Sequence, residues 1–252
     1  MRDLLHFEAI ELKHVAKMSL VGERKTLMTM LAEPVILASK QANEIAACFV
    51  RSFLLSDEKA YPYRHWLMRH ALPDPFARLL AALPFPAPDR MTHDGRRETN
   101  NTKRIYFNRA HQRQFQVCAD FVEAFNSTSM REFLHSMTGA DLDDALLRVE
   151  YCQDTGSFWL EPHTDISVKK FTMLIYLSDD PALTNCGTDI YDATPDHTLV
   201  HTAPYAFNGG LIFVPSADTW HGFHRRDING IRKSLIVNYV APDWRDRWEL
   251  AE

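Results

Sequence analysis

Two histidines and one aspartate have the residue types and spacing to hold a metal ion. His163 and Asp165 stand two positions apart in the segment 162–165 (PHTD), and residues i and i+2 of a strand project from the same face. His221 would add a third ligand from a distant strand. Two histidines and one carboxylate leave positions open on a non-haem iron for a co-substrate and dioxygen. We therefore expect His163, Asp165 and His221 to be the metal ligands and the catalytic centre.

The spacing of histidine and acid is weak evidence by itself. Twelve histidines and 33 acidic residues in 252 positions give about 1.6 His-x-Asp/Glu pairs by chance. The chain has two such pairs, and the other is His6 with Glu8 near the N-terminus. The interpretation of His163 therefore depends on the sequence around it.

Arg232 and Ser234 form a second polar pair that could bind a ligand. They alternate in the strand-like run 232–240 (RKSLIVNYV), so they share one face while Lys233 faces the other way. A planar guanidinium is well suited to binding a carboxylate. An exposed polar strand edge is the alternative, and the presence of His221 upstream favours the binding role.

The elements that must position these residues differ between the two parts of the chain. Residues 1–145 are predicted to be mainly helical, with apolar residues at helical spacing over 39–54, 74–83, 109–125 and 129–139. Asp74 and Pro75 are expected to cap and open one helix, and Ser129 to Glu132 is a capping-box pattern. Short strands are expected at 34–37 and 102–108. Before the second of these strands, 84–101 is a polar, proline-rich loop, and loops of this length are often functional lids or simply mobile.

The part of the chain from residue 146 is rich in β-branched and aromatic runs separated by turn residues. These runs are 146–152, 171–177, 187–193, 198–203, 209–216 and 232–240. Parallel βαβ units would need helices between such strands, so a sandwich or barrel is favoured. We expect a single domain over 1–252, with helical support in 1–145, the strand-rich core in 146–241 and a C-terminal helix in 242–252.

Several motifs in the strand-rich half resemble a known family. They are 147–151 (LRVEY), 156–158 (GSF), 162–165 (PHTD) and 171–178 (FTMLIYLS), followed by Cys186-Gly187 where the family usually has Gly-Gly, and by 210–215 (GLIFVP). His221 also lies eleven residues before Arg232, as in the family. Together they resemble the prolyl-4-hydroxylase-like branch of the iron(II)- and 2-oxoglutarate-dependent oxygenases. The resemblance covers residues 146–241 and extends only loosely to the N-terminal part.

This resemblance implies a fold, cofactors and a reaction. The implied fold is α+β, a double-stranded β-helix (jelly-roll, cupin-like) core with a mainly helical N-terminal part packed on it. The implied cofactors are iron(II), 2-oxoglutarate as co-substrate and dioxygen, with Arg232 and Ser234 binding the far carboxylate of 2-oxoglutarate. Tyr176 and Tyr151 match tyrosines that line the co-substrate pocket in relatives, and ordinary core packing is the alternative for both. Asp165 stands where halogenase relatives have a small residue, so hydroxylation of an unactivated C–H bond is expected.

The substrate is the least specified part of the prediction. Candidate contacts are Trp159, Asp189, Trp220, Asn101 and Arg104, each of which has packing or a solvated surface as its alternative. Acidic and basic candidates together suit a small polar metabolite, such as an amino acid or a sugar-containing compound. A protein or peptide side chain is the alternative substrate.

Two other classes of protein could use the same three ligands. A non-catalytic, cupin-like sensor or binding protein would have no need of a buried cation at Arg232. A zinc hydrolase is disfavoured because the sequence shows no acidic residue evidently poised as a general base.

Composition excludes further classes. Lys and Arg number 28 against 33 Asp and Glu, which gives a net charge of −5, and no long basic run suggests a nucleic-acid partner. No segment has the apolar length of a membrane span or signal peptide, so we expect a cytoplasmic location. The four cysteines stand far apart, which fits reduced thiols. A small-molecule partner is expected, and a homodimer is the default from general frequencies.

Overall fold

A computed structural model describes residues 39–88, 94–96 and 104–252. The chain divides into two units, residues 1–36 and 37–252, and every described residue belongs to the second. The strand expected at 34–37, the candidate Asn101 and much of the loop 84–101 therefore lie outside the described residues. Among the described helices, none has the length and apolar character needed to cross a membrane.

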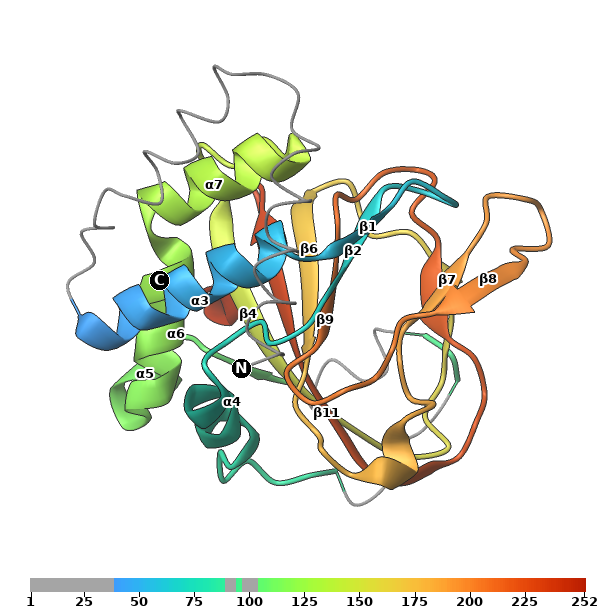
Figure 1. The fold of residues 1–252 in the computed structure, drawn as a ribbon, viewed down its shortest axis with the longest axis horizontal. Helices are drawn as coiled ribbons and strands as arrows, with labels where there is room; N and C mark the ends of the chain where they lie inside the picture. The colour runs from blue at the N-terminus through green and yellow to red at the C-terminus, as the bar shows by residue number, and fades with distance from the viewer. Residues whose placement is uncertain (1–38, 89–93, 97–103) are drawn as a thin grey trace, which may run out of the picture. The chain divides into compact units, whose positions relative to one another are not determined.

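Two antiparallel sheets form the centre of this unit (Figure 1). The larger sheet has the order β1-β2-β9-β6-β11-β4-β3, and the smaller sheet has the order β5-β10-β7-β8. The strands of the larger sheet are β1 Asp57–Lys59, β2 His65–Met68, β3 Ile105–Tyr106, β4 Leu146–Gly156, β6 Lys169–Tyr176, β9 Gly210–Phe213 and β11 Ile228–Val240. Those of the smaller sheet are β5 Leu160–His163, β7 Asp189–Tyr191, β8 Leu199–Thr202 and β10 His221–Phe223. The fold is thus α+β with antiparallel sheets, and the double-stranded β-helix stays a prediction of the resemblance.

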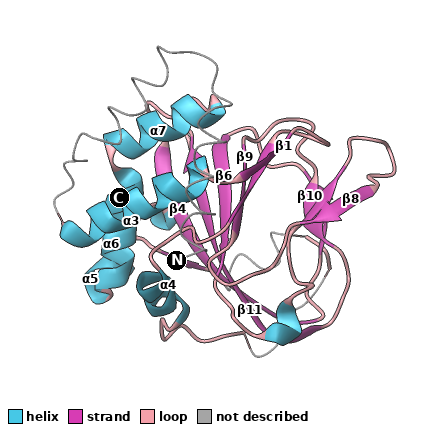
Figure 2. Ribbon diagram, in the orientation of Figure 1, coloured by secondary structure: helices cyan, strands magenta, loops and turns pink. Residues whose placement is uncertain are grey.

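Helices pack beside the larger sheet, away from strands β8 and β10 (Figure 2). They are α3 Lys40–Leu54, α4 Asp74–Ala81, α5 Arg109–Gln114, α6 Gln116–Asn126 and α7 Thr128–Thr138. The helix expected from residue 39 is confirmed, and Ser39 caps it by accepting a hydrogen bond from the amide of Ala42 (3.0 Å). The helix expected over 109–125 is split, because Phe115 adopts an extended conformation between α5 and α6.

Two of the predicted helix starts were wrong, by two residues for α7 and by one residue for α4. Ser127, rather than Ser129, caps α7 by accepting from the amide of Met130. Asp74 is the first residue of α4 rather than its cap. The reason is that its carboxylate accepts a hydrogen bond from Asn208 (2.6 Å), a partner far away in sequence.

The expected C-terminal helix is also wrong. Residues 242–252 contain only the short 3-10 helix Arg247–Glu249. The backbone amide of Ala251 donates to Leu147 (2.9 Å), and Leu250 forms a bridge with Arg148 of β4. Because strand β4 takes these backbone groups, the tail is held in an extended form rather than in a helix.

The two faces of the larger sheet differ sharply in character. Strand alternation sends Val149, Met173 and Val237 toward the helices, and all three are fully buried. The intervening positions face the smaller sheet and include polar or charged side chains on β4, β6 and β11. Apolar burial against the helices stabilises the sheet, which leaves its inner face available for a polar site.

A close approach of two backbone segments requires glycine at position 187. A Cβ atom added there would lie 1.7 Å from the carbonyl oxygen of Ala203. The same two segments are joined by a hydrogen bond from the amide of Ala203 to Thr188 (2.8 Å). This contact fixes the segment that begins at Gly187. The carbonyl of Cys186, just before that segment, accepts a hydrogen bond from Arg232.

We predict that Gly187→Ala lowers the free energy of unfolding by about 3 kcal/mol, because the added methyl overlaps backbone atoms that must move apart. Gly139→Ala is the matched control, since Gly139 ends α7 in the left-handed conformation with open space around its Cα. It should cost only about 1 kcal/mol of conformational strain. Urea denaturation measures both, and equal small losses would contradict the close-approach argument.

Candidate active site

A cavity lies between the inner faces of the two sheets. The described residues that line it come mainly from β4, β5, β6, β10 and β11. They are Arg104, Glu150, Cys152, Asp154, Phe158, Leu160, His163, Asp165, Lys169, Thr172, Leu174, Thr188, His221, Gly222, Phe223, Arg232, Ser234 and Ile236. The three predicted metal ligands and the predicted Arg232-Ser234 pair therefore face one space.

The two histidines of the candidate metal centre are cross-strand neighbours. His163 on β5 stands directly opposite His221 on β10, and their ring centroids are 4.4 Å apart. One ligand atom from each histidine and one from Asp165 all lie within 4.8 Å of one another. The sequence argument was wrong in one detail, because β5 ends at His163 and Asp165 lies in the loop that follows.

Hydrogen bonds to the backbone set the tautomer of both histidines. Nδ1 of His163 contacts the carbonyl oxygen of Glu161 (2.8 Å), and Nδ1 of His221 contacts that of Thr219 (2.9 Å). A carbonyl oxygen only accepts, so Nδ1 carries the proton in each neutral ring and the lone pair is on Nε2. This is the arrangement that orients metal-binding histidines.

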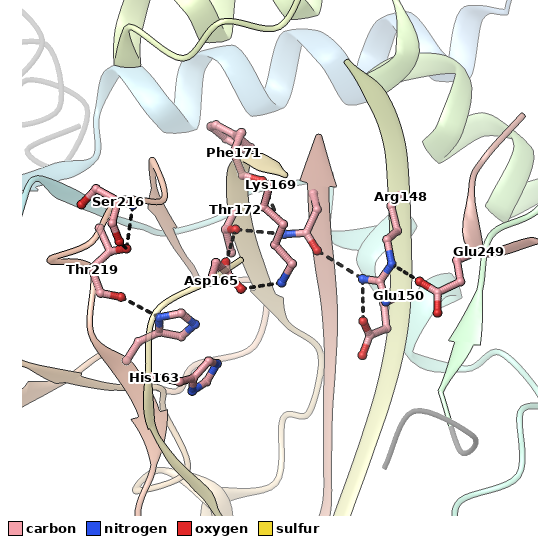
Figure 3. A network of polar contacts seen from close by, with 12 residues as sticks. Arg148, Glu150, His163, Asp165, Lys169, Phe171, Thr172, Ser216, Thr219 and Glu249 are labelled. Atoms are coloured by element: carbon pink, nitrogen blue, oxygen red, sulfur yellow. Dashed lines mark hydrogen bonds and ion pairs between the residues drawn. The ribbon is translucent and has the colours of Figure 1, made fainter. Parts of the chain in front are cut away.

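The Asp165 carboxylate is held from strand β6. Lys169 Nζ donates to Oδ1 (2.5 Å), and the Thr172 hydroxyl donates to Oδ2 (2.6 Å). Figure 3 shows both contacts, with His163 on the same side of the network. A carboxylate oxygen has more than one lone pair, so it can accept a hydrogen bond and also ligate a metal ion. Two imidazoles and one carboxylate converging at a cavity wall fit a non-haem iron(II) ion with open positions.

Arg232 is a buried cation with fixed partners. Its side chain is on the inner face of β11, where Nε donates to the Cys186 carbonyl (2.7 Å) and Nη1 to Asp154 Oδ2 (2.7 Å). Burial alone would lower the pKa of Arg232, but Asp154 and the phenol groups of Tyr205 and Tyr176 raise it above its ordinary value. The guanidinium is therefore charged, and the ring of Phe223 packs 4.7 Å from it.

Ser234 and Tyr176 lie next to this cation. Ser234 is 1% exposed, and its hydroxyl has no hydrogen-bond partner among the described residues. A buried hydroxyl without a partner is costly, so this atom is suited to form a hydrogen bond with a ligand. Tyr176 donates to the Thr188 hydroxyl (3.0 Å) and accepts from the Thr188 amide (3.2 Å), and burial raises its pKa.

The charges that line the cavity are balanced. Among the described lining residues, three are cationic and three are carboxylates. Arg104 contacts Glu150 (3.4 Å) and Asp154 (3.0 Å), and Asp154 also contacts Arg232. The remaining pair is Lys169 with Asp165. The lining therefore carries no net charge when both histidines are neutral.

Tyr151 does not reach the cavity. Strand alternation turns it to the helix-facing side of β4, where its hydroxyl donates to the Ala81 carbonyl (3.5 Å). Its ring packs against Phe85 and Phe107 with centroids 5.2 and 6.5 Å away. Tyr151 thus has the core role that was its alternative. Tyr176 is fully buried and is also not among the described lining residues, so its co-substrate role stays a prediction.

The predicted substrate contacts divide into two groups. Arg104 lines the cavity, whereas Asp189 is fully buried and its carboxylate accepts from Thr202, His224 and Arg226. Because these internal donors satisfy its carboxylate, Asp189 has a structural role. Asn101 lies outside the described residues.

Neither tryptophan candidate is among the lining residues. Trp220 stacks on His197 with ring centroids 3.6 Å apart. The Arg225 guanidinium lies 4.3 Å from the centroid of Trp159, and Gly95 packs so closely that an added Cβ would lie 2.3 Å from the indole. Both indoles thus have contacts within the protein.

Sequence reasoning missed Lys169, Thr172 and Asp154. Lys169 stands four residues after Asp165, and this spacing carries no signal outside a helix. Thr172 and Asp154 reach their partners across strands, so only the sheet register could have pointed to them.

Comparisons with known proteins give structural neighbours only. No family model and no curated protein sequence matches the chain. A prolyl-4-hydroxylase from Pseudomonas putida is 16% identical and has a TM-score of 0.48, over 79% of this chain and 93% of that one. A viral collagen prolyl hydroxylase from Paramecium Bursaria Chlorella virus-1, solved as a 2OG complex, is 14% identical with a TM-score of 0.46, over 70% and 96%. A prolyl hydroxylase from Trichoplax adhaerens, in complex with a hypoxia inducible factor peptide, is 11% identical with a TM-score of 0.48, over 85% and 92%.

We predict that alanine at His163, Asp165 or His221 weakens Co(II) binding by more than about 100-fold, because each substitution removes a direct ligand. His111→Ala is the matched control, since Nδ1 of His111 also contacts a backbone carbonyl (2.7 Å, Tyr106) but lies outside the candidate ligand group. Titration followed by the visible spectrum of Co(II) measures all four. Unchanged affinity in the three ligand variants would contradict the assignment.

Proposed function

We propose that this protein is a non-haem iron(II), 2-oxoglutarate-dependent dioxygenase that hydroxylates an unactivated C–H bond. The observation that carries the proposal is one cavity with two different binding features. The cavity lining offers the His163, Asp165 and His221 ligand set, and it also offers a buried arginine beside a serine hydroxyl that has no partner within the described residues.

The pocket fits a dianion that binds a metal ion at one end. The far carboxylate of 2-oxoglutarate would accept from Ser234 and from the Arg232 guanidinium, whose Nε and one Nη already hold it in place. The balanced lining supports the same co-substrate. A divalent cation adds two positive charges to a neutral cavity, and a dianion restores neutrality in a space where uncompensated charge is costly.

The protein's own contribution is ligand geometry, charge and exclusion of water. Bound iron(II) and 2-oxoglutarate supply the oxidising chemistry with dioxygen, and succinate and carbon dioxide are the co-products. Phe158, Leu160, Leu174, Phe223 and Ile236 provide the apolar part of the lining. They keep water from the centre, which protects reactive species and strengthens the ion pairs around it.

The two other classes of protein fit these observations less well. A zinc hydrolase needs a carboxylate that can act as general base, and the lining acids Glu150 and Asp154 are both tied to arginines. A binding protein with a bare metal site gives no reason for a buried cation beside the Ser234 hydroxyl, which lacks a partner in the part of the chain that the structure describes.

For the substrate, we propose a small polar metabolite with both acidic and basic groups. The support is that Arg104 reaches the cavity and that Glu150 and Asp154 lie beside it, so the lining offers both signs of charge. A peptide side chain is the competing substrate class, and the solved neighbours include a hydroxylase in complex with a peptide.

A succinate-release screen tests the reaction and the substrate class together. Purified protein with iron(II), 2-oxoglutarate and dioxygen is assayed against free amino acids, sugar-containing metabolites and proline-containing peptides. We expect succinate release in excess of the substrate-free rate with a member of the small polar set, and a product heavier by one oxygen atom in the mass spectrum. Turnover with peptides alone would overturn the substrate proposal.

Asp165→Ala provides the control for this screen, because loss of the carboxylate ligand should abolish succinate release. Arg64→Lys is a second control, since exposed Arg64 pairs with Glu58, is not among the described lining residues and should leave the reaction intact. Full turnover in the Asp165 variant would contradict the proposed reaction class.

A further inference from the structure

The three candidate metal ligands are not positioned in the same way. His163 and His221 lie on paired strands, and each imidazole is tied to a carbonyl two residues earlier in its own chain segment. Asp165 follows the end of β5, so no strand geometry fixes the direction of its carboxylate. Side chains outside β5 hold the carboxylate, among them Lys169 and Thr172 of β6.

Thr172 belongs to a row of polar residues that crosses the inner face of the larger sheet. Thr172 on β6 stands directly opposite Asn238 on β11, and Asn238 stands directly opposite Arg148 on β4. Each is at most 2% exposed. Such burial is costly unless every polar group is satisfied, so a polar row at the centre of a sheet needs a reason.

The hydrogen bonds along this row have a fixed direction. Arg148 can only donate, and its Nη1 contacts Asn238 Oδ1 (3.2 Å). The amide nitrogen of Asn238 must therefore face Thr172, where it donates to Oγ1 (2.9 Å). Since Asn238 donates to this hydroxyl and the Asp165 carboxylate can only accept, the Thr172 hydroxyl proton is directed to Asp165 Oδ2 (2.6 Å).

The far end of the row is anchored in the C-terminal segment. Arg148 Nε donates to Glu249 Oε2 (2.5 Å), and Nη1 also contacts Glu150 Oε2 (2.7 Å). Figure 3 shows this network running from Asp165 through Thr172 to Arg148, Glu150 and Glu249. Two buried carboxylates thus hold the Arg148 guanidinium, and its contact with Asn238 sets the direction of the hydrogen bonds along the row.

We propose that Thr172 is a positioning residue for the metal ligand Asp165, and that Asn238 and Arg148 act through it by fixing the direction of its hydroxyl. The inference rests on the proposed function, since it assumes that Asp165 ligates a metal ion. The row selects a carboxylate rotamer that leaves a lone pair toward the two histidines. Its removal weakens metal binding even where the fold is kept.

Binding of Mn(II) alone, measured by the electron paramagnetic resonance signal of the free ion, tests the proposal without turnover. Thr172→Val keeps the shape and removes the hydroxyl, and should weaken Mn(II) affinity by about 10–100-fold. Thr172→Ser restores the hydroxyl and should bind close to wild type. Asn238→Asp replaces the donor to Thr172 with an acceptor that competes for its proton, and should also weaken binding.

Thr138→Val is the matched control, because the Thr138 hydroxyl is also buried and bonded, to the Leu134 carbonyl in α7 (2.7 Å). It should lower the melting temperature and leave Mn(II) affinity unchanged. If the role of Thr172 were purely structural, Thr172→Val would have the same two effects. Wild-type affinity in folded Thr172→Val overturns the proposal. If that variant does not fold, wild-type affinity in Asn238→Asp overturns it instead. Failure of the wild-type protein to bind Mn(II) would count against the proposed function itself.

Discussion

The direction of the Asp165 carboxylate is the constraint on which the candidate site depends. The two histidines are aligned by strand pairing and by their own backbone, but the third ligand lies beyond its strand and needs outside support. That support comes from the inner face of the larger sheet, through Thr172 and Lys169. The sheet can carry polar residues there because its other face, packed against helices, supplies apolar burial.

Buried charge imposes the second constraint. Ion pairs inside a protein are tolerated when each charge has a partner, and the lining of this cavity pairs Arg104 and Arg232 with Glu150 and Asp154. In a neutral cavity a dication is expected to bind more weakly alone than together with a dianion. The metal ion and 2-oxoglutarate are therefore expected to raise each other's affinity through a shared electrostatic term.

The sequence was sufficient for features that depend on local pattern. Period-two runs predicted most strands of the core, and alternation correctly placed Arg232 and Ser234 on one face. The same alternation turns Tyr151 away from the cavity. The sequence alone does not give the strand register that shows this. The tail after residue 241 was misjudged because its backbone bonds to β4, a contact that no local pattern encodes. Thr172 was missed for a similar reason, since its role follows from its neighbours on β11.

The most direct test of the account is an anaerobic titration of the protein with iron(II) and 2-oxoglutarate, followed by visible absorption. Chelation of the metal by the co-substrate in the pocket should give a weak charge-transfer band that neither addition produces alone. Arg232→Met should show the band only at much higher 2-oxoglutarate concentration, because the far carboxylate has lost its cation. Protein that binds iron(II) but gives no band at any 2-oxoglutarate concentration would contradict the account.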